Sequence, residues 1–118
     1  MIDKISLWLE MQELQKHEML AHLFNLSETD SLAYFHILGE NNLNLQEIAK
    51  KLSKDRTTAQ KTVKKLVEQG LVHRRKINLT KGGIKYSYEA VPFSIVKQKM
   101  LEKVNDWHSI AQSKINTL

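Results

Sequence analysis

The sequence predicts a mainly α-helical protein with one small β-hairpin, built as a single domain of 118 residues. Apolar residues recur at helical spacing through most of the chain, and helix-capping residues stand before several of these stretches. After Gly70 the spacing of apolar residues changes to two, as in a β-hairpin. The length suits one globular core and leaves little room for a second.

The first predicted helix spans residues 3–24. Its apolar stripe is too wide for a helix that lies alone on a surface, so we expect burial on more than one side. The N-terminus is charged throughout, unlike a signal peptide, and no apolar stretch is long enough to cross a membrane. Cysteine is absent, which excludes disulfides and cysteine-rich zinc sites. We therefore expect a soluble, cytoplasmic protein.

Two short helices are predicted next, each introduced by its own cap. Ser27, with Asp30 three residues later, predicts a helix over residues 28–38. Asn44 and Glu47 repeat this arrangement before a third helix. The expected apolar positions are Leu32, Phe35 and Leu38 in the first of these helices and Leu45, Ile48, Ala49 and Leu52 in the second.

A fourth helix is predicted between Asp55, which caps it, and Gly70, which ends it. Its expected inner face consists of Ala59, Thr62, Val63, Leu66 and Val67. The opposite face carries Arg56, Thr57, Gln60, Lys61 and Lys64. Such a helix packs its apolar face on the core and presents its basic face outward.

The segments "LVHRRKI" and "IKYSYEAV" then predict a β-hairpin with a basic tip, since "NLTKGG" between them holds residues that tolerate a positive φ. Pro92, the only proline, ends the hairpin and begins a last helix over residues 94–116. Helices, a turn, a further helix and a hairpin in this order predict a winged helix-turn-helix.

The net charge of +5 is concentrated in one part of the chain. From Lys54 to Lys85, ten basic residues face two acidic ones, which gives 10 − 2 = +8 in 32 residues. The other 86 residues therefore sum to 5 − 8 = −3. This segregation indicates a face that binds a polyanion, the alternative being an ordinary solvated surface.

The run "LNLQEIAKKLSKDRTTAQKTVKKLVEQGLVHRRK" resembles the central motif of the MarR and TrmB groups of prokaryotic transcription regulators. The later "KYSYEAVPF" is similar to the exit from the wing into the dimerisation helix of TrmB-like proteins. The resemblance, which covers residues 26–93, implies a homodimer that binds double-stranded DNA through a recognition helix and a wing. Full-length TrmB regulators add a large C-terminal sugar-sensing domain that 118 residues are too few to contain, so sugar sensing is not implied.

The DNA-binding residues expected on the recognition helix are Arg56, Thr57, Thr58, Gln60, Lys61 and Lys64. Most lie near the N-terminal end of the helix, the end that enters the major groove. Arginine can bond a guanine edge through two hydrogen bonds, and glutamine an adenine edge. Lys64, one turn further, suits a backbone phosphate. The alternative for Thr57 and Thr58 is that they support the helix cap and bind no ligand. The alternative for the other residues is that they form an ordinary solvated face.

On the wing, Arg75, Lys81 and Lys85 are the expected DNA contacts. Strand alternation prevents all the basic residues from pointing one way, so Arg74 and Lys76 are less favoured. Tyr86 and Tyr88 share one side of the hairpin with Ile84 and are expected to pack there, with stacking on bases as the alternative.

The last helix carries apolar residues in steps of three and four, like a coiled coil, and Ile115 lies beside this seam. Its stripe and the N-terminal helix predict a dimer interface that includes Trp8, Met100, Val104, Trp107, Ala111 and Leu118. The alternative is that both helices fold back on their own domain. We divide the chain into an N-terminal helix (residues 1–25), a winged-helix core (26–92) and a dimerisation helix (93–118).

Signals of an enzyme or a cofactor site are lacking in the sequence. His17 and His22 in "HEMLAH" are five residues apart, about 140° round a helix, so they diverge and do not match the zinc motif HExxH. No nucleophile elbow or phosphate-binding loop is present. We expect no catalysis, no cofactor and no membrane partner; an effector ligand is unknown. A winged helix that docks proteins and a general chromosomal or RNA-binding protein are the alternative functions.

Overall fold

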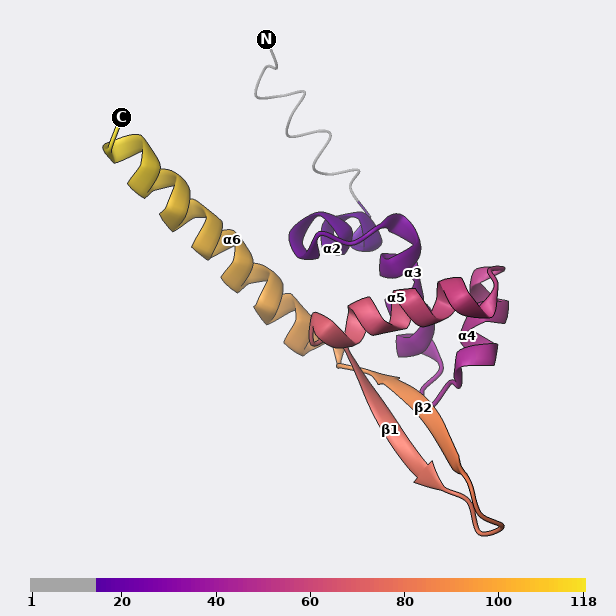
Figure 1. The fold of residues 1–118 in the computed structure, drawn as a ribbon. Coiled ribbons are helices and arrows are strands. Elements are labelled where there is room, and N and C mark those ends of the chain that lie inside the picture. Colours follow the sequence, from indigo (N-terminus) through magenta and orange to yellow (C-terminus); the bar gives the residue numbers. More distant parts are fainter. Residues whose placement is uncertain (1–14) are drawn as a thin grey trace.

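The computed structural model describes residues 15–118. Its elements, in chain order, are α2 (Lys16–Phe24), α3 (Glu28–Gly39), α4 (Leu45–Leu52), α5 (Arg56–Glu68), β1 (Val72–Asn78), β2 (Ile84–Ala90) and α6 (Phe93–Asn116). Helices α3, α4 and α5 pack together at the base of the β1–β2 hairpin, and α6 leaves this core as a long rod (Figure 1). The predicted winged-helix fold is confirmed.

Two of the predicted caps start their helices as expected. The Ser27 hydroxyl accepts a hydrogen bond from the Asp30 amide at 3.1 Å, and the Asp30 carboxylate accepts one from the Ser27 amide. Asn44 and Glu47 form the same reciprocal pair at the start of α4. Each pair satisfies amides that the first turn of a helix leaves without partners, so local sequence determines where these helices begin.

The predicted first helix is interrupted at Gln15. Gln15 has an extended backbone (φ −81°, ψ 161°) and caps α2, and its amide donates to the Glu18 carboxylate at 3.3 Å. The prediction of one continuous helix over residues 3–24 was therefore wrong at Gln15, because a capping pair inside the apolar pattern starts a new helix. Residues 1–14, including Trp8, lie outside the described residues.

Helix α3 is buried on a different face from the predicted one. Its buried residues are Asp30, Ser31, Ala33, Tyr34 and Ile37. Leu32 is 37% exposed, and Phe35 and Leu38 only border the core. The reason is that α3 touches α2, α4, α5 and β2 and is enclosed by them, so small and polar side chains that adjoin these neighbours are also covered. The spacing of apolar residues along the sequence does not indicate that α3 lies at the centre of the fold.

Tyr34 ties α3 to the exit of the hairpin. Its hydroxyl, buried with the rest of the side chain, donates to the Val91 carbonyl at 2.6 Å. Burial raises the pKa of Tyr34 to about 12. The phenol therefore keeps its proton, and remains a donor, throughout the neutral range.

Helix α5 packs on the core through Ala59, Thr62, Val63 and Leu66, as predicted. Val67 was also expected on this face, but it is 39% exposed. Successive residues of a helix are about 100° apart, which carries Val67 from the side of Leu66 to the edge of the polar face.

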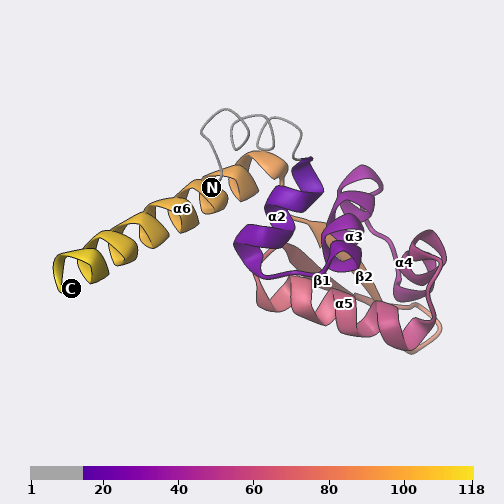
Figure 2. The same ribbon diagram turned by 90° about the horizontal axis from the view of Figure 1, so that it is seen from above.

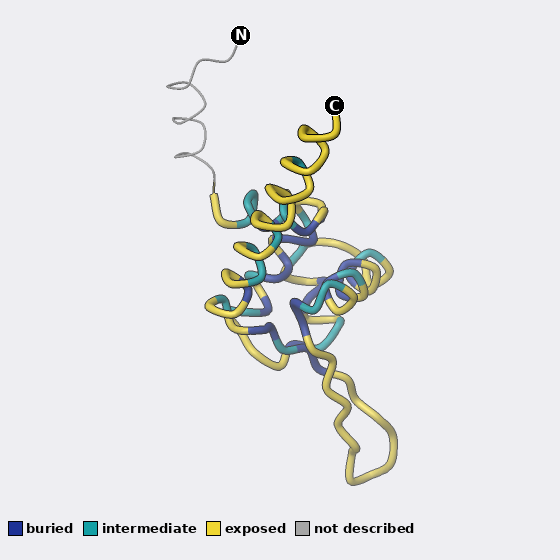
Figure 3. Tube along the Cα trace, turned by 90° about the vertical axis from the view of Figure 1, so that its left-hand side faces the viewer, coloured by how far each residue is buried: buried dark blue, intermediate teal, exposed yellow. Residues whose placement is uncertain are grey.

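The hairpin is antiparallel, and Val72 pairs with Ala90 at its base. Leu43 forms a bridge to Tyr88 on the other edge of β2 and thereby anchors the base to the helices. The hairpin is buried there and exposed beyond it (Figure 3). Gly82 and Gly83 have φ values of 84° and 100° at the tip, the conformation predicted for this turn.

Asp30 is a buried carboxylate whose negative charge is compensated by a neighbouring lysine and by hydrogen-bond donors. It lies 3.3 Å from the Lys65 ammonium on α5, and Thr62 is also adjacent. Burial raises the pKa of this carboxyl, but hydrogen bonds from Ser27 and the contacts with Lys65 and Thr62 outweigh burial, so the net pKa is below its usual 3.8. A carboxyl whose pKa is lower in the folded than in the unfolded state stabilises the fold above the unfolded pKa.

We expect the free energy of unfolding to fall as the pH drops below about 4, because Asp30 then takes up a proton on unfolding. The Asp30→Asn variant should lack this part of the fall. Urea denaturation of both proteins at a series of pH values measures the difference, with Glu28→Gln, an exposed carboxyl on the same helix, as the control. A wild-type pH dependence retained in Asp30→Asn would contradict the assignment.

Helix α6 contacts the core through its N-terminal half, as far as Lys103, whose ammonium lies 4.7 Å from the centre of the Phe24 ring. Val96 is fully buried, and the Lys99 ammonium donates to the Gly70 carbonyl at 3.0 Å, which joins α6 to the C-terminal end of α5. Its 24 residues correspond to about 36 Å, and the distal part extends away from the other elements (Figure 2). No helix in residues 15–118 is long and apolar enough to cross a membrane.

Candidate nucleic-acid interface

The outer face of α5 is exposed and basic. Asp55 caps the helix by accepting a hydrogen bond from the Thr58 amide at 2.7 Å. The five residues predicted for the outer face, Arg56, Thr57, Gln60, Lys61 and Lys64, are all exposed. Thr58 is only partly exposed and serves the cap.

The Asp55 carboxylate lies near these cations at the start of α5. It reduces the net positive charge of the outer face only there. Hydrogen bonds from the Thr58 side chain and backbone lower the pKa of Asp55, and the charges of Lys61 and Lys54 lower it further. Asp55 is therefore ionised at neutral pH, and the rest of the outer face carries only the positive charges of Arg56, Lys61 and Lys64.

The strand register divides the hairpin into two faces. Arg74 lies opposite Tyr88 and Lys76 opposite Tyr86, whereas Arg75 lies opposite Ser87. Residues directly opposite each other point to the same side of an antiparallel pair. Arg74 lines the space between the hairpin and α5 together with Arg56 and Gln60, so it lies on the face that turns toward α5, and Arg75 belongs to the other face.

An open groove of about 400 Å³ lies between this face of the hairpin and the N-terminal half of α5. We call it the wing groove. It is lined by Asn44, Leu45, Gln46, Arg56, Gln60, Arg74, Ile84, Lys85, Tyr86 and Tyr88. The Arg74 guanidinium lies 4.4 Å from the centre of the Tyr86 ring, a cation–π contact that holds it in place. The groove thus brings together Arg56, Arg74 and Lys85 without an acidic residue in its lining.

The other predicted wing residues lie elsewhere. Arg75 is 3.6 Å from the Glu89 carboxylate on the face that does not line the wing groove. Lys81 is at the exposed tip of the hairpin. Tyr88 packs in the core as predicted, and Tyr86 packs against Arg74 on the wing itself.

The apolar stripe of α6 is the second exposed feature. Of the residues predicted for a dimer interface, Val104 is 43%, Trp107 70% and Leu118 101% exposed. Met100 is partly buried against the core of its own protomer, and Ala111 is partly buried. Leu101 and Ile110 are large exposed apolar residues that the sequence reasoning missed. Positions 104, 107, 111, 115 and 118 fall on one side of the helix, so this stripe is continuous.

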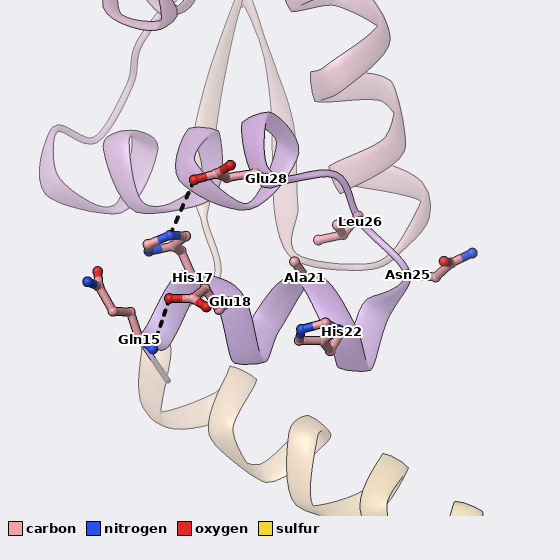
Figure 4. A pocket seen from close by; sticks show the side chains of 8 residues that line it. All are labelled: Gln15, His17, Glu18, Ala21, His22, Asn25, Leu26 and Glu28. Carbon is pink, nitrogen blue, oxygen red and sulfur yellow. Dashed lines mark hydrogen bonds and ion pairs between the residues drawn. The ribbon is translucent and has the colours of Figure 1, made fainter. Parts of the chain in front are cut away.

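Another hollow, of about 720 Å³, lies away from the basic face, between α2 and the start of α3. Figure 4 shows His17 directed at Glu28, 3.7 Å away, while His22 stands further along α2. Within residues 15–118 no group of three or more His, Asp or Glu residues is positioned to hold a metal ion.

Residues 20–94 match the family described as sugar-specific transcriptional regulator TrmB. The chain belongs to the TrmB family. The match includes every residue of the wing groove and the whole of α5, so the basic face is part of the family's shared region. The family and the fold are those of transcription regulators.

Two proteins of similar sequence come from Methanocaldococcus jannaschii. The uncharacterized protein MJ1503 is 34% identical over 89 residues, which cover 75% of this chain and 67% of that protein. The uncharacterized protein MJ1082 is 35% identical over 91 residues, which cover 77% of this chain and 75% of that protein.

Among solved structures, a possible transcriptional regulator from Methanosarcina mazei Go1 has a TM-score of 0.76 at 24% identity, with 85% of each chain covered. The ST1889 protein of Sulfolobus tokodaii has a TM-score of 0.68 at 23% identity, covering 81% of this chain and 94% of that one. A MepR–DNA complex from S. aureus has a TM-score of 0.59 at 14% identity, covering 98% and 94%. These likenesses agree in the winged-helix fold.

Proposed function

We propose that this TrmB-family protein is a homodimeric transcription regulator that binds specific sequences in double-stranded DNA. The observation that carries this proposal is the wing groove, where the hairpin and the exposed face of α5 present Arg56, Gln60, Arg74 and Lys85 together. One solved structure of the same fold, MepR, is a complex with DNA. A docking module for proteins would not require this concentration of cations.

In the proposed complex, α5 enters the major groove with its N-terminal half. Arg56 and Gln60 reach base edges, where a good bidentate pair adds about 1 to 3 kcal/mol of discrimination. Thr57 and Lys64, one helical turn or more apart on the outer face, contact phosphates. Lys61 lies further round the helix, on the side of α3, and contacts a phosphate.

The hairpin then lies along the adjacent minor groove or its phosphates. Arg74, held against Tyr86, is directed to the same side as α5 and is ready to bind without further ordering. Lys85 borders the same groove, and Lys81 at the tip lies further out along the proposed path of the DNA.

Two neighbouring arginines provide a matched comparison on the wing. We expect Arg74→Ala to weaken duplex affinity by about tenfold, because it removes a preorganised cation from the interface, and Arg75→Ala to have a smaller effect. Fluorescence anisotropy with one duplex measures both, and thermal melting checks that both variants fold. Equal losses in the two variants, or a larger loss in Arg75→Ala, would mean that the opposite face of the hairpin meets the DNA.

Dimerisation follows from the exposed stripe on α6. A second copy would cover Val104, Trp107 and their neighbours and would hold two α5 helices at a fixed distance. A two-fold dimer reads half-sites about 34 Å apart, one turn of DNA, or a multiple of it. The protein should therefore select pseudo-palindromic sites.

Selection from a random duplex library tests the sequence-specific part of the proposal. The purified protein is expected to enrich a pair of inverted half-sites with one fixed spacing. Enrichment of no sequence above the starting library, together with measurable duplex binding, would indicate a general chromosomal protein instead.

A further inference from the structure

A second hollow borders α5 on the side away from the hairpin. It has a volume of about 390 Å³ and lies where the first turn of α3, the turn before α5 and the flank of α5 meet. Thr29, Asp30, Lys54, Lys61 and Lys65 line it, with the Thr58 cap at its edge. We call it the α3-side hollow. Of these residues, only Thr58 and Lys61 were expected at a DNA interface from the sequence.

The side chains that line the α3-side hollow carry a net positive charge. The Lys65 ammonium lies 3.3 Å from the Asp30 carboxylate, so this pair is close to neutral. Lys54 and Lys61 form no ion pair within 4 Å among the residues that the structure describes. Both side chains are exposed, and each acts on Asp55 only from a longer distance. The hollow therefore has two cations available to an anion.

The geometry of α5 places this hollow opposite the wing groove. At about 100° per residue, Arg56 and Gln60 fall on the hairpin flank of α5, and Lys61 and Lys65 fall on the α3 flank. A helix in the major groove, which is about 12 Å wide, lies between two sugar-phosphate backbones. If the hairpin flank meets one backbone and its adjoining groove, the α3 flank faces the other.

We propose that the α3-side hollow binds a backbone phosphate of duplex DNA. Lys54 and Lys61 supply the charge, and the Thr29 hydroxyl supplies a hydrogen bond to a phosphate oxygen. Lys65 holds the Asp30 carboxylate, so that its charge does not repel the phosphate. This inference rests on the proposed function, since it assigns a second point of contact to the same DNA.

A phosphate contact fixes the register of the protein on the duplex but carries no sequence information. Its loss should therefore weaken specific and non-specific binding by the same factor. It should also reduce the number of counterions that the DNA releases, by about 0.9 in the slope of log affinity against log salt for each phosphate lost.

The double variant Lys54→Gln/Thr29→Ala tests the site, because neither side chain is in a hydrogen bond or ion pair within the described residues. The control is Lys114→Gln, which removes the same charge from the distal end of α6. Each protein is titrated by fluorescence anisotropy with a promoter duplex, a random DNA duplex and a duplex RNA, across a salt series.

We expect the double variant to bind both DNA duplexes about threefold to tenfold more weakly than the wild type, with a shallower salt slope. Lys114→Gln should match the wild type. Equal affinities and slopes in the double variant and Lys114→Gln would overturn the phosphate site while leaving the proposed function intact. A loss confined to duplex RNA would overturn it in favour of an RNA site. Absence of salt-dependent DNA binding in the wild type would overturn the proposed function and the phosphate site together.

Discussion

Replacing Arg56, Gln60 and Lys61 together by alanine is expected to lower affinity for the specific DNA site by at least about 30-fold, because two base contacts are worth about 1 to 3 kcal/mol each. Affinity for random duplex should fall far less, since most phosphate contacts remain. The three side chains are exposed on α5, so the fold and its stability should be unchanged. Competition titrations of wild type and variant with both duplexes measure the ratio of specific to random affinity.

The matched control for this variant is the double substitution Asn105→Ala/Gln112→Ala on the polar side of α6. It removes exposed polar side chains from a helix without altering α5, and it should bind DNA like the wild type. If the α5 triple variant kept the wild-type ratio of specific to random affinity, α5 would not be the reading element.

Introducing acidic residues into the stripe of α6 is expected to dissociate the protein. In the Val104→Glu/Trp107→Glu variant, a dimer would have to bury four carboxylates that have no basic partners in the stripe, which costs far more than the lost apolar contact. Sedimentation velocity should show a monomer where the wild type is a dimer. Each half-site would then bind alone, and affinity for the full site should fall by at least about 100-fold because the effective concentration of the second half-site is lost.

The control places the same charges on the other side of the helix. Asn105 and Ser109 lie roughly opposite the stripe by the helical repeat, so Asn105→Glu/Ser109→Glu should leave both the dimer and its DNA affinity intact. A wild-type protein that sediments as a monomer would contradict the dimer directly. A variant with glutamates in the stripe that remains dimeric would show that the stripe of α6 is not the dimer interface.

The start points of α3 and α4 were predictable because their signals are local. Ser27 and Asn44 each bond to an amide three residues ahead, and nothing distant is needed to recognise the pattern. The glycines of the hairpin tip are a similar case, since only a positive φ at Gly82 and Gly83 closes that turn. The winged-helix order followed from these signals together.

The buried face of α3 was not predictable in the same way. Tyr34 is covered because the neighbouring elements, β2 among them, enclose α3, and its hydroxyl donates to the carbonyl of Val91, 57 residues later in the chain. Leu32, a better apolar residue by type, points away from those elements. Packing against distant parts of the chain decides which face of α3 is buried. The spacing of apolar residues within one helix contains no information about that packing.

At the candidate site, the sequence likewise did not decide which of Arg74 and Arg75 faces α5. Both arginines are in one strand, and alternation places them on opposite faces. Arg74 lines the wing groove beside Arg56 and Gln60, and Arg75 does not. The residues opposite the two arginines do not distinguish them, because Tyr88 and Ser87 are both buried. The packing of the hairpin on α5 decides which arginine faces α5, and the sequence of the strand contains no information about that packing.

The most direct test of sequence-specific DNA binding is an anisotropy titration of the wild-type protein with its own promoter duplex and a random duplex, across a salt series. We expect the promoter to be bound more tightly at every salt concentration, and log affinity to fall by about 0.9 per neutralised phosphate against log salt. Weak binding to both duplexes that does not depend on salt would contradict the proposed function and would indicate a winged helix that docks a protein partner.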